Sequence, residues 1–402
     1  MKTSSGIEIT VSSVRWLQLL FILMLPAGVQ AQFTYAVTNQ TVTITGYTGT
    51  VPGWLDVPSS IDGYPVTGIG NAAFIDCLTL TSVIIPNGIT NIGDAAFGKC
   101  TNLTKVVIGP DLVNIGRSSF AECLSLGSIT IPNKVAYIGD LAFCRCGSLT
   151  NIAIGTNVAN IAERAFLECT NIANFKIPAS VTNIGILAFA VCSSLKTIDV
   201  SSNNPAYISI NGVLFNKDQT KLVAYPPAKT GAYSIPLGVT DIGDSALFGC
   251  SELTAITVPM SVTNIEEYGL SSCANLSGIY FQGMPPALAD SSVFSYDPEA
   301  TVYYLPGTKG WSATLGGLPT TVWPQPNPSI IYQSVGFHGQ NGEFSFVIVW
   351  VGNLSVVVEV CTNLTNPVWT PVATTVLTNG ATYFADPRSK NDPGRFYRVR
   401  SP

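Results

Sequence analysis

The sequence contains few charged residues and a single histidine. Asp, Glu, Lys and Arg make up 11% of the 402 residues, and the net charge is −5. Nucleic-acid binding requires clustered Lys and Arg to neutralise phosphates, so the sequence excludes this class of partner. Because the only histidine is His338, the region N-terminal to it has no Ser-His-Asp or Cys-His arrangement. A GxxxxGK[ST] phosphate-binding motif is also missing.

Long apolar runs are missing beyond residue 25. The one apolar run, WLQLLFILML at 16–25, follows Lys2 and Arg15 and precedes PAGVQA. This run is too short to span a bilayer comfortably, and the small residues after it are typical of a cleavage site. The pattern predicts a secretory signal peptide over 1–31, with an uncleaved anchor as the alternative. The mature chain is then secreted, periplasmic or on the cell surface, without an integral membrane segment.

A repeat of 23 residues dominates the rest of the sequence. An aromatic or leucine side chain marks each unit, at Phe74, Phe97, Phe120, Phe143, Phe166, Phe189, Leu247 and Leu270. Counting this residue as position 0, a cysteine stands at +3 in every unit: Cys77, Cys100, Cys123, Cys146, Cys169, Cys192, Cys250 and Cys273. One unit cannot bury its own apolar positions, so the units are expected to stack around a continuous core.

The spacing inside a unit predicts its local structure. Apolar residues at 0 and +3, with an acid such as Asp94 at −3, predict a short helical turn with an acidic cap. Residues +9 and +11, such as Ile129 and Ile131, lie two apart and predict a short strand with one buried face. The predicted fold class is a solenoid of eight coils, with a parallel sheet and short helical turns.

The unit resembles the BspA-like leucine-rich repeat of exported bacterial proteins. Its pattern AFxxCxxLxxIxIPxxVxxIG appears as SFAECLSLGSITIPNKVAYIG over 119–139. The resemblance implies a single-handed solenoid and a secreted or surface role in binding and adhesion. It implies no catalytic residue, cofactor or metal.

The repeat and its flanks divide the chain into segments. We predict an N-terminal cap at 32–72, a solenoid at 73–283, a C-terminal cap at 284–322, a Pro-rich linker at 323–329 and a β-sandwich at 330–402. The sandwich resembles immunoglobulin-like or fibronectin-like modules.

The solenoid is interrupted near 203–235. Turn signals at Asn211-Gly212 and Lys217-Asp218 predict hairpins that project from the stack. The insert is either a decorated coil or a binding feature, since Tyr207, Tyr225 and Tyr233 gather near it.

The cysteines admit two interpretations. An exported chain with ten cysteines favours disulfides, whereas a column of parallel side chains favours buried, reduced thiols. We predict reduced thiols, with only Cys144 and Cys361, outside the column, being reactive. A line of sulfurs does not converge on a metal.

The predicted function is non-catalytic binding or adhesion to an extracellular protein or polysaccharide. The candidate contact residues lie on outward strand positions, in the insert and near the C-terminal cap: Lys105, Thr130, Asn151, Lys176, Tyr207, Tyr225, Tyr280 and Trp311. The alternatives are a structural envelope or matrix component and a solenoid glycan-acting enzyme. The enzyme needs two placed acids, and the recurring acids fit structural columns instead.

Overall fold

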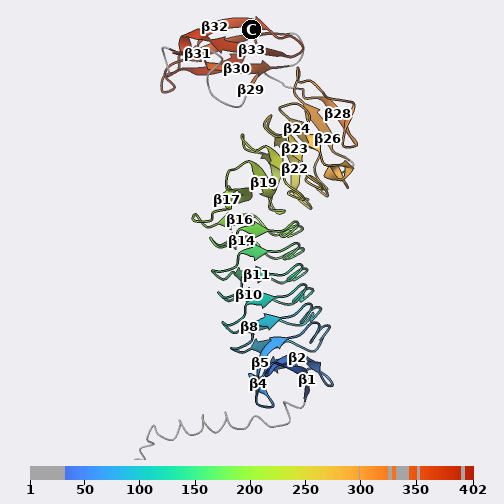
Figure 1. The fold of residues 1–402 in the computed structure, drawn as a ribbon. Helices are drawn as coiled ribbons and strands as arrows, with labels where there is room; N and C mark the ends of the chain where they lie inside the picture. The colour runs from blue at the N-terminus through green and yellow to red at the C-terminus, as the bar shows by residue number, and fades with distance from the viewer. Residues whose placement is uncertain (1–31, 298, 325–327, 332–343, 351–353, 391–393) are drawn as a thin grey trace, which may run out of the picture.

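The structure, a computed structural model, describes residues 32–297, 299–324, 328–331, 344–350, 354–390 and 394–402. The predicted signal peptide and His338 lie outside these residues. The chain forms an elongated rod with the N-terminal strands at one end and a small β domain at the other (Figure 1). The rod is a β-solenoid of about 11 turns of roughly 23 residues. It has more turns than the eight predicted coils because the two predicted caps also contribute rungs.

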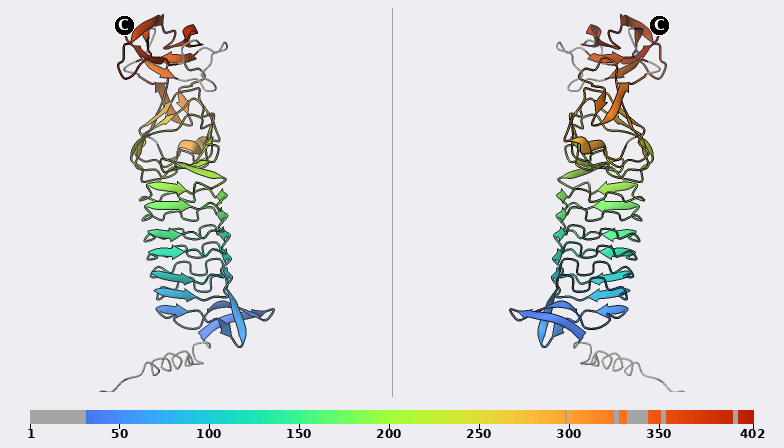
Figure 2. Two further views of the ribbon diagram at one scale, coloured as in Figure 1. Left: turned by 90° about the vertical axis from the view of Figure 1, so that its left-hand side faces the viewer. Right: turned by 90° about the vertical axis from the view of Figure 1, so that its right-hand side faces the viewer.

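Longer strands stack in parallel along the rod (Figure 2) and are called the long-strand ladder. They are β3 (Trp54–Asp56), β6 (Ser82–Ile85), β8 (Lys105–Ile108), β10 (Ser128–Thr130), β12 (Asn151–Ala153), β14 (Asn174–Ile177), β16 (Thr197–Val200), β20 (Gly231–Ser234), β22 (Leu253–Val258), β24 (Gly278–Phe281), β26 (Thr301–Tyr304) and β28 (Leu318–Val322). In the regular coils paired residues are 23 apart, as in Ser128 with Asn151. Alternate side chains enter the core, which matches the predicted strand at +9 and +11.

Shorter parallel strands form a second stack, the short-strand ladder. They are β5 (Tyr64–Ile69), β7 (Asn91–Ile92), β9 (Asn114–Ile115), β11 (Tyr137–Ile138), β13 (Asn160–Ile161), β15 (Asn183–Ile184), β19 (Lys221–Ala224), β21 (Asp241–Ile242), β23 (Asn264–Ile265) and β25 (Ala287–Leu288). At the N-terminus, β1 (Phe33–Thr38) and β2 (Thr41–Tyr47) pair antiparallel, and β2 continues into this ladder through β5. The small strand β4 (Ser60–Ile61) also pairs with β5.

The predicted helical turn at each repeat is wrong. Ala95 and Lys99, at −2 and +2, have φ values of 52° and 60°, whereas a right-handed helix needs negative φ throughout. The N–H groups of Ala95, Phe97 and Lys99 donate to carbonyls of the next coil at 2.7–2.8 Å. The turns therefore form a third inter-coil stack, which we call the turn ladder. In the described residues the helices are the 3₁₀ turns η2 (Ser291–Phe294) and η3 (Pro387–Lys390).

The acid at −3 does not cap a helix either. The Oδ1 atom of Asp94 accepts a hydrogen bond from the backbone N–H of Arg117, one coil further, at 2.8 Å. The Oδ1 atom of Asn71 likewise accepts a hydrogen bond from the backbone N–H of Asp94, also at 2.8 Å. Because the acceptor is a side-chain oxygen in both cases, Asp and Asn are interchangeable at this position.

Phenylalanine rings fill the centre of the turn ladder. Neighbouring rings from Phe74 to Phe166 stack with centroids 5.3–5.4 Å apart and planes within 11° of parallel. The column cysteines from Cys100 to Cys192 lie beside this stack, and each Sγ donates to the carbonyl of the preceding coil's position 0. The distance is 3.2 Å from Cys123 to the oxygen of Phe97 and 3.1 Å from Cys146 to that of Phe120. The thiols therefore join adjacent coils as well as filling space.

The insert does not project from the rod. Strands β17 (Tyr207–Ile210) and β18 (Val213–Asn216) form a hairpin that pairs on through β19 into the short-strand ladder. At its Asn211-Gly212 turn, the Gly212 carbonyl accepts from the N–H of Ile198 in the long-strand ladder, so the hairpin crosses the rod. Leu214 packs in the N-terminal core, whereas Val213 and Phe215 pack in a separate C-terminal core. Strand β18 thus divides the solenoid interior in two.

The C-terminal coil region ends around η2 and the antiparallel pair of β27 (Thr314–Leu315) with β28. Asp297 lies buried here, with 3% of its surface exposed, and neither carboxylate oxygen has a hydrogen-bond partner among the described residues. Burial raises the pKa of Asp297 to about 7, although the nearby backbone N–H groups of Cys273 and Ser272 lower it in part.

We predict that Asp297 makes the rod less stable as pH rises. Because the folded pKa exceeds the unfolded value of about 4, the protonated acid favours folding, and this contribution is lost between about pH 4 and 7. Asp297→Asn is therefore expected to raise the unfolding free energy at pH 8 and to leave it nearly unchanged at pH 4. Urea unfolding of both chains at the two pH values measures the difference. An equal effect at both would contradict the prediction.

The small C-terminal β domain consists of two three-stranded antiparallel sheets. One has the order β29 (Ser329–Ile331), β30 (Phe344–Val349), β33 (Ala381–Asp386), and the other β32 (Thr370–Val376), β31 (Ser355–Cys361), β34 (Phe396–Arg400). Their shared core includes Phe346, Ile348, Val356, Val358 and Leu377. This domain rests on the last coils, where Leu305 and Val349 are buried together with Met260 and Trp323.

Candidate functional site

The outward side of the long-strand ladder carries four of the predicted contact residues. Lys105, Thr130, Asn151 and Lys176 are exposed on the consecutive strands β8, β10, β12 and β14. We call the outward side chains of this ladder the strand face. A shallow cavity of about 510 Å³ lies along β12, β14 and β16 and includes Lys176 in its lining.

Aromatic residues continue the strand face at its C-terminal end. Tyr280 on β24 stacks on Tyr303 of β26, with ring centroids 4.7 Å apart and planes 9° apart. The ring centroid of Trp323 lies 4.8 Å from that of Tyr280. All three are partly exposed, so the rings form an aromatic platform beside the small polar side chains of the earlier rungs.

The other predicted contact residues are placed differently. Tyr225 is 4% exposed and packs on Tyr233 with centroids 4.7 Å apart, so its assignment to a free surface is wrong. Tyr207 is half-buried, and its hydroxyl accepts a hydrogen bond from the N–H of Ile184 at 3.0 Å. Trp311 stacks on Tyr304 at 5.0 Å and donates to the Gly283 carbonyl at 3.3 Å. These three side chains mainly hold the rod together.

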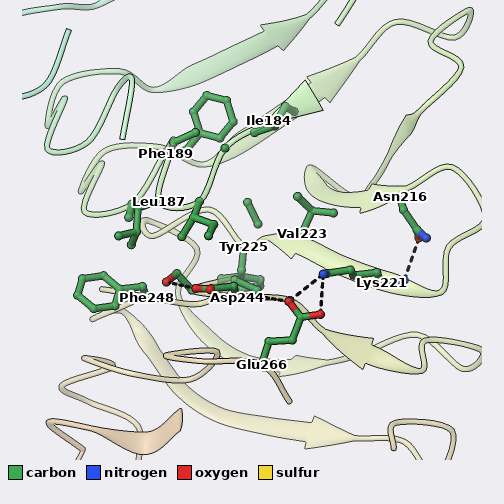
Figure 3. Close-up of a pocket in the computed structure, with 18 of the residues that line it drawn as sticks. Ile184, Leu187, Phe189, Asn216, Lys221, Val223, Tyr225, Asp244, Phe248 and Glu266 are labelled. Atoms are coloured by element: carbon green, nitrogen blue, oxygen red, sulfur yellow. Dashed lines mark hydrogen bonds and ion pairs between the residues drawn. The ribbon is translucent and has the colours of Figure 1, made fainter. Parts of the chain in front are cut away.

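A cavity of about 500 Å³, which we call the notch, opens beside the insert. In Figure 3, Leu187 and Phe248 lie one above the other at the left, on the two lips, and Tyr225 and Val223 lie to their right. The lips are turns of two different coils, those of Phe189 and Leu247.

The notch exists because the coil between its lips has a shortened turn. Leu222 pairs with Ile242, which stands five residues before Leu247. The N–H of Tyr225, only three residues after Leu222, already donates to the Ala246 carbonyl. Two residues are therefore missing from this turn, and Pro226 and Pro227 follow at once.

One side of the notch is polar. Lys221 forms an ion pair with Glu266 at 2.6 Å, and the N–H of Asp244 donates to the same carboxylate at 3.0 Å. The ion pair is about one-third exposed, so its contribution to stability is small. Its charges compensate each other, which leaves the apolar lips and the backbone as the distinctive features of the notch.

The repeat pattern of the chain can now be compared with known families. The family model described as BspA type leucine rich repeat region matches in six copies over residues 67–196, 113–226 and 224–307. These ranges together exceed half of the chain. The chain belongs to the BspA-type leucine-rich repeat family.

Solved structures share this BspA-type fold. A leucine rich cell surface protein from Faecalibacterium prausnitzii A2-165 is 27% identical, with a TM-score of 0.52, over 68% of this chain and 86% of its own. The pneumococcal vaccine antigen PcpA is 18% identical, with a TM-score of 0.53, over 68% and 92%, and shows similarity of fold alone. No curated protein sequence is significantly similar to the chain. No helix in the described part of the chain is long and apolar enough to cross a bilayer.

The notch is the feature that sequence reasoning missed in this BspA-type chain. The available signal was the interval of 58 residues between Phe189 and Leu247, in which no AFxxC turn occurs. A regular BspA-type unit would supply that turn. Its absence predicts an opening in the turn ladder, but only once the turn ladder itself is known.

The ten cysteines of the BspA-type chain are all free thiols. Cys144 and Cys361, expected to be reactive, are buried with 8% and 2% of their surfaces exposed. Cys77 is instead half-buried, because no regular coil precedes it to supply a carbonyl acceptor. A hydrogen bond with the Cys100 thiol lowers the pKa of Cys77, whereas burial raises that of Cys144.

We predict that iodoacetamide modifies Cys77 first in the folded chain. Mass spectrometry of digested, briefly treated protein is expected to find label at Cys77, and at the other cysteines only after denaturation. Denatured, unreduced chain should titrate ten thiols. Cys77→Ser should abolish the early labelling. Early labelling of Cys144 or Cys361, or fewer than ten thiols, would contradict this account.

Proposed function

We propose that the chain is an exported, non-catalytic binding protein, cleaved after residue 31, whose strand face contacts an extracellular protein or polysaccharide. The observation that carries the proposal is the make-up of this face, with exposed polar side chains on successive strands from Lys105 to Lys176 and, beyond the insert, the aromatic platform at Tyr280 and Tyr303. The similarity to a Faecalibacterium prausnitzii leucine rich cell surface protein supports an extracellular location.

The strand face suits an elongated or flat partner. Each coil adds outward side chains at a spacing of ~4.8 Å, so a partner can make the same kind of contact on successive rungs. Polar residues such as Thr130 and Asn151 supply hydrogen bonds, while Lys105 and Lys176 supply positive charge. Since aromatic residues dominate binding energy, the platform at Tyr280 is expected to contribute most.

Arrays of matrix proteins and polysaccharides provide the test. Purified chain comprising residues 32–402 is expected to be retained saturably on at least one surface. Tyr280→Ala should reduce retention at least tenfold. Tyr137→Ala is the matched control, because Tyr137 is exposed on the short-strand ladder, away from the strand face.

Three outcomes would contradict the proposal. Loss of retention by Tyr137→Ala but not by Tyr280→Ala would place the contact elsewhere. No retention on any surface, together with filaments in the electron microscope, would favour a structural envelope component. Release of reducing sugar from a polysaccharide would show an enzyme.

A further inference from the structure

The turn ladder satisfies its backbone groups only by pairing with the next coil. In the regular coil of Phe143, the N–H groups of Leu141, Phe143 and Arg145 donate to carbonyls of the following coil at 2.8–2.9 Å. The same three-bond pattern recurs in the coils of Phe97, Phe120 and Phe166. Each turn therefore needs a neighbouring backbone on both sides.

The coil of Phe189 lacks this neighbour. The N–H groups of Leu187 and Phe189 have no hydrogen-bond acceptor among the described residues, although their equivalents in the preceding coils do. Phe189 is only 3% exposed, and both residues line the notch. Backbone N–H groups in native proteins are nearly always paired, with protein or with water, so these two groups are available to a backbone that enters the notch.

The opposite lip presents the complementary groups. The carbonyls of Asp244 and Phe248, which face the shortened coil, accept no hydrogen bond from the described residues. In a regular coil, the residue equivalent to Pro227 would donate to the Phe248 carbonyl. Proline has no N–H, so it cannot make this bond. The notch thus offers two donors on one lip, at Leu187 and Phe189, and one open acceptor on the other, at Asp244.

The notch has defined ends. At one end, Val191 packs against Gly249, where an added Cβ would lie 3.0 Å from a Val191 methyl group, so the lips meet. At the other end stand Lys221 and Glu266, paired with each other. Between these ends lies space for a segment of a few residues, flanked by apolar side chains.

We propose that the notch binds an extended peptide segment of a partner protein, which replaces the missing turn. Two of its carbonyls accept from the N–H groups of Leu187 and Phe189, and one of its own N–H groups donates to the carbonyl of Asp244, beside the bond that Tyr225 already makes to Ala246. Alternate carbonyls of an extended chain lie ~6.6 Å apart on one side and match donors that are two residues apart. Adding a backbone to an open edge in this way is a known mode of peptide recognition.

A peptide fits these requirements better than a sugar or a small apolar ligand. The notch needs both acceptors and donors at a regular spacing, and a main chain carries both at every second residue. Its apolar lips, at Leu187 and Phe248, favour small apolar side chains on the segment. Proline at a donating position is excluded. This site is separate from the strand face and does not depend on the proposed function.

The test uses hydrogen exchange of the full chain and a defined probe. The probe is the acetylated and amidated octapeptide IGDAAFGK, residues 92–99 of this chain, whose backbone pairs with neighbouring turns in a regular coil. In the free chain, the amides of Leu187 and Phe189 are expected to exchange at least tenfold faster than those of Leu141 and Phe143. Millimolar probe should slow exchange at Leu187 and Phe189 at least fivefold. The same peptide with N-methyl groups on the amides of Ala95 and Lys99, which removes these two donors, should have no effect.

Two variants separate notch binding from other effects. Val223→Trp fills the notch and should abolish protection by the probe, whereas Leu124→Trp, on an exposed turn of a regular coil, should preserve it. Tyr280→Ala should also preserve it, which distinguishes this site from the strand face. Exchange at Leu187 and Phe189 that is as slow as at Leu141 and Phe143, or protection that survives Val223→Trp, would overturn the proposal. Equal protection by the N-methylated peptide would also overturn it.

Discussion

Replacing Phe143 by alanine is expected to lower the unfolding free energy by about 3–5 kcal/mol, the usual cost of truncating a fully buried aromatic ring. Phe143 has no exposed surface and stacks on both Phe120 and Phe166, with centroids 5.4 Å away on each side. Because both neighbours are held by their own coils, the cavity cannot close easily. The loss therefore includes two ring contacts as well as the buried area.

Phe143→Leu is the control for this prediction. Leucine occupies the same position at Leu247 and Leu270, so the turn tolerates it, and the loss should be less than half of that for alanine. Denaturant unfolding followed by circular dichroism measures both variants. A loss below about 1.5 kcal/mol for alanine would show that the stack relaxes around the gap and would contradict the argument.

Replacing Asn204 by valine is expected to destabilise the chain by roughly 2–4 kcal/mol, since each hydrogen bond contributes about 1 kcal/mol and buried partners are left unpaired. Asn204 is 1% exposed and stands where regular coils carry Ile, Leu or Val. Its amide nitrogen donates to two carbonyls, at Pro178 and Val181, and its oxygen accepts from two N–H groups, all at 2.8 Å. These bonds fix the point at which the insert leaves the regular coil.

Asn203→Val tests whether the effect belongs to the buried side chain. Asn203 is adjacent and exposed, so its replacement should change the unfolding free energy by no more than about 0.5 kcal/mol. Asn204→Val should also expose β17 and β18 to faster hydrogen exchange. If valine instead stabilises the chain, as it would in a regular coil, the role assigned to these hydrogen bonds is wrong.

The sequence predicted the structure correctly where a repeated column of residues has a single physical cause. The phenylalanine and cysteine columns and the alternation around Ile129 and Ile131 follow from burial alone, so they predict the coil and its strand. The helical turn was mispredicted because an acid followed by apolar residues three apart also describes a helix. The positive φ values of Ala95 and Lys99 arise from bonds to the next coil, which a local pattern does not contain.

The candidate site residues also fall into predictable and unpredictable positions. Lys105 and Lys176 could be placed on the strand face because strand alternation fixes their direction. Tyr225 could not be placed, because its burial depends on where the insert rejoins the stack. The notch depends on two residues missing before Tyr225 and on unpaired groups of coils that lie far away in the sequence. Such a feature becomes visible only when neighbouring coils are compared in space.

The division of the rod by β18 also has a mechanical consequence. The hydrogen bonds of all three ladders join one coil to the next, so a force that pulls the two ends apart acts on these bonds directly. Beside β18 the turn ladder is interrupted, and the apolar core does not continue across the strand. This cross-section is therefore the weakest, and under tension the rod is expected to part between Phe189 and Leu247, with the coils on either side still folded.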